Sequence, residues 1–168
     1  MRHITSSVVL LAAALACGNA SAQQQAGPQP FPQSEYGPSI GIDDAMKVAA
    51  AAAAEAKKNN WAMSIAVVGT SGDLMYFERL GNTSFASIDL SIHKARAAAR
   101  FRSPTGRFAE RLAAGPANIY LLSFDGFIAG RGGELIVAGG KVIGAIGVSG
   151  STAAHDEQVT RAGVNAIK

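Results

Sequence analysis

Two β-hairpin patterns, separated by helical segments, constrain the fold of this chain most. Residues 61–80 hold two β runs around a turn rich in glycine and serine, and residues 134–148 hold two more around Gly139-Gly140. Consecutive glycines favour the tight turn of a two-residue hairpin. Because a hairpin pairs its strands antiparallel, the sequence predicts an antiparallel sheet. The predicted strands lie at 61–68, 74–80, 134–137 and 142–148.

Helices and a fifth strand are predicted around these hairpins. The segment 43–58 has two aspartates at its start, an alanine-rich centre and two lysines at its end, which favours a helix. A continuous apolar run at 117–123 predicts one more, buried strand. We therefore expect an α+β fold with a five-stranded antiparallel sheet and flanking helices. The helices are predicted at 43–58, 86–101, 104–112 and 154–167.

Residues 1–22 have the composition of a secretory signal peptide. A basic start precedes an apolar run at 8–16, and residues 20–22 (Ala-Ser-Ala) have the small-x-small form that signal peptidase cleaves. The run is shorter than the roughly 20 residues that a membrane-spanning helix needs. We expect cleavage after this site and a periplasmic or secreted protein, with a lipid anchor at Cys17 as the alternative.

The remaining chain divides into a leader and one domain. Residues 23–38 are rich in Gln, Pro and Gly, and they predict a flexible leader because such a composition buries little apolar surface. Residues 39–168 have the size of a single domain. If cleavage follows residue 22, the mature chain has no cysteine, which excludes disulfides and thiolate chemistry. No Lys/Arg run is interleaved with aromatic residues, so nucleic-acid binding is not expected.

The C-terminal hairpin and helix carry the residues of a known family. The glycine-rich stretch 132–150, followed by an Asp-Glu pair, resembles the C-terminal signature of the GlcG/HbpS family (DUF336, haem-degrading). Lys94 and the alanine after it fit that family's central helix, and the resemblance covers nearly all of 39–168. It implies a profilin-like α-β-α sandwich, frequent homo-oligomerisation and, in some members, haem binding or slow haem degradation.

A polar stripe on the helix between the hairpins holds the residues that a haem would need. Asp89, His93, Arg96 and Arg100 share this stripe at helical spacing. His93 is the candidate ligand of the haem iron, with Asp89 placed to orient its ring and the arginines placed to meet the propionates. The alternative is a solvated helix face. The apolar stripe beside it comprises Ile88, Ile92, Ala95 and Ala99, and the candidate haem-binding residues are His93, Lys94, Arg96 and Arg100.

The start of the last helix offers weak candidates for proton transfer. His155 is followed by Asp156 and Glu157, and a histidine beside carboxylates can act as an acid or base. The alternative is that the two acids simply favour the positive end of the helix.

The turn before this helix offers an anion seat. Gly147, Ser149 and Gly150 lie where a strand passes into a helix, so free backbone N–H groups could hold a carboxylate or propionate. The alternative is that the glycines permit a tight turn and close packing without any ligand.

The sequence leaves three functions open. The first is an exported small-ligand binder with haem as the ligand, in which any haem breakdown is chemistry of the bound iron and peroxide. The second is an enzyme or accessory protein that acts on a small carboxylate or aromatic metabolite, and the third is a structural oligomer without a ligand. Enzymatic activity is not decided by these patterns.

Overall fold

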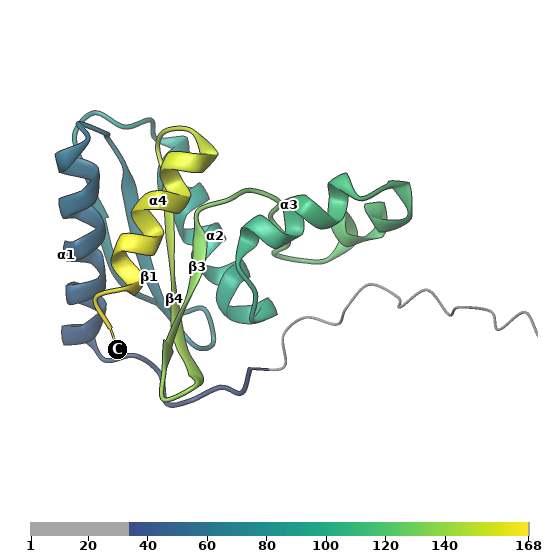
Figure 1. Cartoon of the computed structure of the whole chain (residues 1–168), viewed down its shortest axis with the longest axis horizontal. Helices are drawn as coiled ribbons and strands as arrows, with labels where there is room; N and C mark the ends of the chain where they lie inside the picture. Colours follow the sequence, from purple (N-terminus) through teal and green to yellow (C-terminus); the bar gives the residue numbers. More distant parts are fainter. Residues whose placement is uncertain (1–33, 168) are drawn as a thin grey trace, which may run out of the picture.

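Two hairpins lie side by side and form one antiparallel sheet, as Figure 1 shows. The computed structural model describes residues 34–167. The strand order is β2-β1-β4-β3, so β1 and β4 are central. Gly139 and Gly140 have φ angles of 57° and 75°, the conformation that the tight hairpin turn requires. The strands are β1 (Ser64–Gly69), β2 (Leu74–Arg79), β3 (Gly133–Ala138) and β4 (Lys141–Ser149).

Helices cover both faces of this sheet and give three layers, α-β-α (Figure 1). The helices α1 (Ile42–Lys58) and α4 (Ala153–Val164) pack on one face, against large aliphatic side chains such as those of Ile65 and Ile146. The helix α2 (Ala86–Phe101) packs on the other face, where the buried strand side chains include Ala66 and Ala145. Side chains alternate between the two faces along each strand, so the larger ones lie under α1 and α4 and the smaller ones under α2. The helix α2 can therefore lie closer to the sheet than α1 and α4 can.

The smallest side chains lie where α2 meets β4. A Cβ at Gly147 would stand 2.0 Å from the backbone oxygen of Ser91 and 2.5 Å from the backbone nitrogen of Ala95, so the helix rests directly on the strand. Of the predicted apolar stripe, Ala95 and Ala99 are buried in the cluster between α2 and the sheet, and the half-buried Ile92 packs against it, whereas Ile88 is half-buried and outside this cluster. The buried residues of α2 are otherwise small, apart from one lysine: Ser87, Ser91, Lys94, Ala95, Ala97, Ala98 and Ala99.

The predicted fifth strand was wrong, and the sheet has four strands. The segment forms instead a 3-10 helix, η1 (Pro116–Ser123), after the short helix α3 (Thr105–Ala113). Pro116 suits a first helical turn, and of the apolar side chains in this segment Leu121 is buried whereas Ile119 and Leu122 are exposed. Figure 1 shows that α3 and η1 form an arm that projects from the sandwich.

The ordered contacts of the domain begin before residue 39, where the sequence analysis places the start of the domain. Tyr36 forms a parallel bridge with Val142, and its hydroxyl donates a hydrogen bond of 2.8 Å to the carbonyl of Ala99. The predicted signal peptide and most of the predicted leader lie outside the described residues. Within 34–167 there is no helix long and apolar enough to cross a membrane.

We predict that Gly147→Ala destabilises the domain, because the added methyl group meets helix backbone that cannot move aside alone. Overpacking of this kind costs about 1–3 kcal/mol or more of unfolding free energy. Gly106→Ala is the matched control, since its Cβ would meet only the flexible Arg131 side chain at 3.3 Å and alanine favours a helix. Urea unfolding of both variants checks this, and equal stabilities would contradict the close contact.

Candidate functional site

A cavity of about 370 Å³ lies on the outer face of α2. Three of the predicted haem-binding residues line it together: His93, Arg96 and Arg100. Their spacing of three and four residues puts all three on one face of α2, the face turned away from the sheet. The polar stripe is thus one wall of a cavity. The full lining is His93, Arg96, Ala97, Arg100, Asp125, Gly126, Phe127 and Ile128.

The arginines of this wall are held by the turn between β1 and β2. The Nε of Arg96 donates to the carbonyl of Gly72 at 3.0 Å, and the Nε of Arg100 donates to the carbonyl of Ser71 at 3.2 Å. Each bond engages the Nε of its guanidinium, and no hydrogen bond among the described residues uses the terminal nitrogens of either arginine. In the part of the chain that the structure describes, no hydrogen bond joins Asp89 to His93, and Asp89 does not line the cavity.

The opposite wall is the segment 125–128, which follows η1 and which the sequence analysis missed. The ring of Phe127 lies 5.0 Å from that of Phe108 and 6.2 Å from that of Phe101, so an aromatic cluster anchors the segment to α2 and α3. The cavity therefore joins a cationic wall to an apolar one. The spacing of aromatic residues at 124 and 127 was the available signal, but nothing local indicates that they return to α2.

Lys94 does not line this cavity, because it points to the other side of α2. Its Nζ donates to Asp156 Oδ2 at 2.7 Å and to the carbonyl of Val148 at 2.9 Å, and only 6% of the residue is exposed. Asp156 also accepts from the backbone N–H of Ser151 at 3.3 Å. The structure thus joins two residues that the sequence analysis assigned to different sites, in a buried ion pair that ties α2 to α4 and to the end of β4.

The environment of this pair has opposing effects on the Asp156 carboxyl. Burial raises the pKa of Asp156 above its usual value, while the hydrogen bond and charge of Lys94 act to lower it, and burial has the larger effect. The lysine therefore offsets much of the cost of burying this carboxylate. Neither side chain lines the cavity on α2 or any of three further cavities between described residues, so the surroundings of the pair are those of a structural contact.

The three candidates for proton transfer point in three directions. The ring of His155 stacks on Trp61 with centroids 3.9 Å apart, and its Nδ1 is 2.9 Å from the hydroxyl of Ser151. Asp156 is turned inward to Lys94. Glu157 accepts from Arg131 at 2.7 Å and from Arg161 at 2.6 Å. Consecutive helix positions diverge by nature, so these residues do not converge on one reacting atom.

The proposed anion seat before α4 is filled by the protein's own groups. The N–H of His155 donates to the Thr152 hydroxyl, and that of Ser151 donates to Asp156. Gly147 makes the close contact with α2, Ser149 is buried, and a Cβ at Gly150 would lie 2.4 Å from the carbonyl of Ala62. Close packing accounts for all three positions.

These features define an antiparallel α-β-α domain with an amphipathic cavity on the exposed face of its central helix. Residues 40–165 match the family model described as "Haem degrading protein HbpS-like", so the chain belongs to the HbpS-like family. The predicted membership of the GlcG/HbpS family is confirmed.

Individual relatives support the same assignment. Protein GlcG of Escherichia coli (strain K12) is 36% identical over 105 residues, which cover 62% of this chain and 77% of GlcG. The crystal structure of HbpS superposes with a TM-score of 0.72 at 29% identity, over 81% of this chain and 95% of that chain. The crystal structure of a PduOC:heme complex has a TM-score of 0.72 at 21% identity, over 77% of this chain and 96% of that one, and shares the fold.

We predict that Lys94→Met lowers the unfolding free energy by about 3–5 kcal/mol at neutral pH, because it leaves a buried carboxylate without its partner. The pKa of Asp156 would then rise further, since both effects of Lys94 lower it. A raised pKa in the folded state means that acid favours folding through this group, so the loss should be smaller at about pH 5 than at about pH 8.

The matched control is Lys141→Met, which removes an exposed ion pair to Glu35 at 3.3 Å. It should change stability by less than about 1 kcal/mol at either pH. Urea unfolding at both pH values measures both variants. A Lys94→Met loss that is equally large in acid would show that an uncompensated Asp156 charge is not its cause.

Proposed function

We propose that this protein binds haem in the cavity on α2, with His93 as ligand of the iron. The observation that carries the proposal is that His93, Arg96 and Arg100 line one cavity together with Phe127 and Ile128. An imidazole, two guanidinium groups and an apolar wall are the groups that iron, propionates and a porphyrin edge need. Membership of a family described as haem degrading, and a PduOC relative of the same fold that was crystallised with haem, support it.

The residues of the cavity fit this ligand with a defined orientation. The propionates would pair with Arg96 and Arg100, whose guanidinium groups are already held by the turn at Ser71 and Gly72. The porphyrin edge would lie against Phe127. A volume of about 370 Å³ is at the small end for ligand sites, so the macrocycle would remain partly open to solvent. Asp125 is the one carboxylate in the lining, and it disfavours propionates on its side.

Haem breakdown, if it accompanies binding, needs no nucleophile from this chain. Bound haem supplies the redox chemistry through its iron and an external peroxide. The residues described here would hold the iron at His93 Nε2 or Nδ1, fix the propionates and cover one edge of the ring with apolar surface. The same open geometry would admit peroxide and release products.

We predict that haem titrated into the protein gives a saturable Soret band that shifts in His93→Ala, because the iron loses its imidazole. Arg100→Gln should weaken binding by about ten-fold or more, the value of a charged hydrogen bond. Absorbance titration measures both.

His155→Ala is the matched control, since this histidine stacks on Trp61 away from the cavity, and its titration should equal that of the unmodified protein. A Soret band that is unchanged in His93→Ala but altered in His155→Ala would contradict the proposal and would indicate His155 as the iron ligand.

We also propose that the protein is exported to the periplasm or secreted, on the basis of residues 1–22. Mass spectrometry of the protein from the periplasm or medium should give a chain that begins at Gln23. A chain that begins at Cys17 with an added lipid mass would establish the lipoprotein instead. Retention of all the first 22 residues in the cytoplasm would contradict both.

Homo-oligomerisation, which the family resemblance implies, stays a proposal. The arm of α3 and η1 supplies a surface for it, because Ile119, Tyr120, Leu122 and Phe124 are exposed on an uncharged segment. Apolar side chains gathered on a projecting element are typical of contacts between copies.

A further inference from the structure

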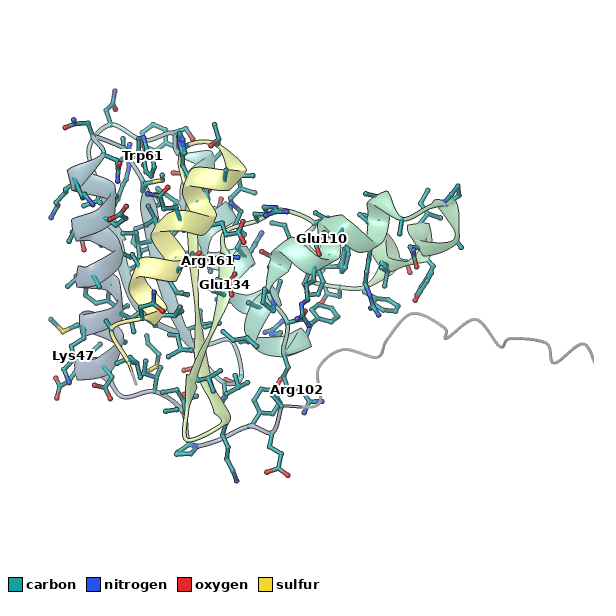
Figure 2. All side chains as sticks on the ribbon, viewed as in Figure 1. Lys47, Trp61, Arg102, Glu110, Glu134 and Arg161 are labelled. Atoms are coloured by element: carbon teal, nitrogen blue, oxygen red, sulfur yellow. The ribbon has the colours of Figure 1, made fainter. Side chains whose placement is uncertain are left out.

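A second cavity, of about 330 Å³, lies between α3, α4 and the start of β3. It differs from the α2 cavity in that charged side chains dominate its lining. They are Arg107, Glu110, Arg131, Glu134, Glu157 and Arg161. Figure 2 shows Arg161 and Glu134 labelled side by side where α4 lies over β3, with Glu110 on the neighbouring α3.

The ion pairs of this cavity leave one cation and one carboxyl without a partner. Arg131 donates to Glu157 at 2.7 Å and to Glu110 at 3.3 Å, and Arg161 donates to Glu157 at 2.6 Å. Within residues 34–167, the side chains of Arg107 and Glu134 make neither a hydrogen bond nor an ion pair. Glu134 is half-buried and Arg107 is exposed, and both line the same cavity, so a ligand there would meet an acidic group and a cation that no other side chain already engages.

The floor of the cavity is built without a side chain. A Cβ at Gly132 would lie 2.7 Å from the Cβ of Asp156 and 3.2 Å from the Nζ of Lys94, so the floor is backbone that lies directly on the buried ion pair. Its φ of 103° favours glycine as well. Gly132 therefore separates the cavity from the buried pair, and its missing side chain leaves room for Lys94 and Asp156 beneath the floor.

We propose that this cavity is a second binding site, which takes a small monocarboxylate with a further polar group. Arg107 and Arg161 would pair with the carboxylate, and Glu134 would donate a hydrogen bond to the further polar group. A dianion such as phosphate fits less well, because Glu110 and Glu157 on the rim would repel it more strongly. The site is separate from the haem cavity and shares no lining residue with it.

The surroundings of Glu134 suit a proton donor. Burial raises the pKa of Glu134, the charges of Arg161 and Arg107 lower it, and that of Glu157 raises it. Glu110 and Arg131 complete the charged groups around the cavity. An arriving carboxylate adds negative charge beside Glu134 and raises its pKa further, so binding should take up a proton and weaken as pH rises.

The test is calorimetric titration of the purified protein with lactate, pyruvate, propionate and benzoate at constant ionic strength, with phosphate and chloride for comparison. At least one monocarboxylate should bind saturably and more tightly than phosphate. Arg107→Gln should raise its Kd by about ten-fold or more. Glu134→Gln should keep binding but remove its pH dependence, because the amide still donates and no longer titrates.

The two cavities supply controls for each other. Arg107→Gln should leave the haem titration unchanged, and Arg100→Gln should leave the carboxylate titration unchanged. Thermal unfolding of each variant verifies the fold. The proposal is overturned if no carboxylate binds more tightly than phosphate and chloride, or if Arg107→Gln leaves the Kd unchanged. Either failure leaves the haem proposal standing, and failure of haem binding alone leaves this one standing.

Discussion

The direct contact of α2 with β4 is the constraint on which the rest of this structure depends. Because Gly147 has no side chain, backbone touches backbone, and α2 meets β4 at this point through the small residues Ser91 and Ala95. The helix is then fixed in depth and in rotation. His93, Arg96 and Arg100 must face outward, and Lys94 must face the end of β4, where Asp156 meets it.

The ion pair of Lys94 and Asp156 joins elements that are distant in sequence. Its partners belong to α2 and α4, and the carbonyl of Val148 brings in the end of β4. A buried pair of this kind is weak evidence for extra stability, since two hydrophobic side chains could replace it at little cost. What it contributes is a fixed register between the helices on the two faces of the sheet, because each charge is the other's only ion-pair partner among the described residues.

Most of the fold could be predicted from the sequence. The hairpins and the helices α1, α2 and α4 follow from periodicity, turn glycines and terminal charges, which are local signals. The segment η1 could not be predicted, since an apolar run of this length fits a buried strand as well as a 3-10 helix, and no local pattern shows that most of its side chains stay exposed. One member of the predicted apolar stripe on α2, Ile88, lies outside the packed cluster for a related reason. Hydrophobicity alone favours isoleucine at the core, whereas the close contact at Gly147 selects serine and alanine.

Of the two walls of the candidate site, the sequence predicts the wall on α2 but not the wall at 125–128. One face of one helix is visible in the sequence, so the pattern places His93, Arg96 and Arg100 together, and all three line one cavity in the structure. The wall at Phe127 and the partner of Lys94 depend on chain segments that return from a distance, and no local pattern encodes them.

The adjacency of His93 and Lys94 has a mechanical meaning. One residue belongs to the solvent side of α2 and the next to its interior side, on a helix that Gly147 prevents from rolling. A rotation of α2 about its axis cannot move His93 toward a ligand, because the same rotation would break the ion pair between Lys94 and Asp156. A molecule in this cavity would therefore meet a helix wall of fixed rotation on one side, and on the other the segment 125–128, which Phe127 holds against Phe101 and Phe108.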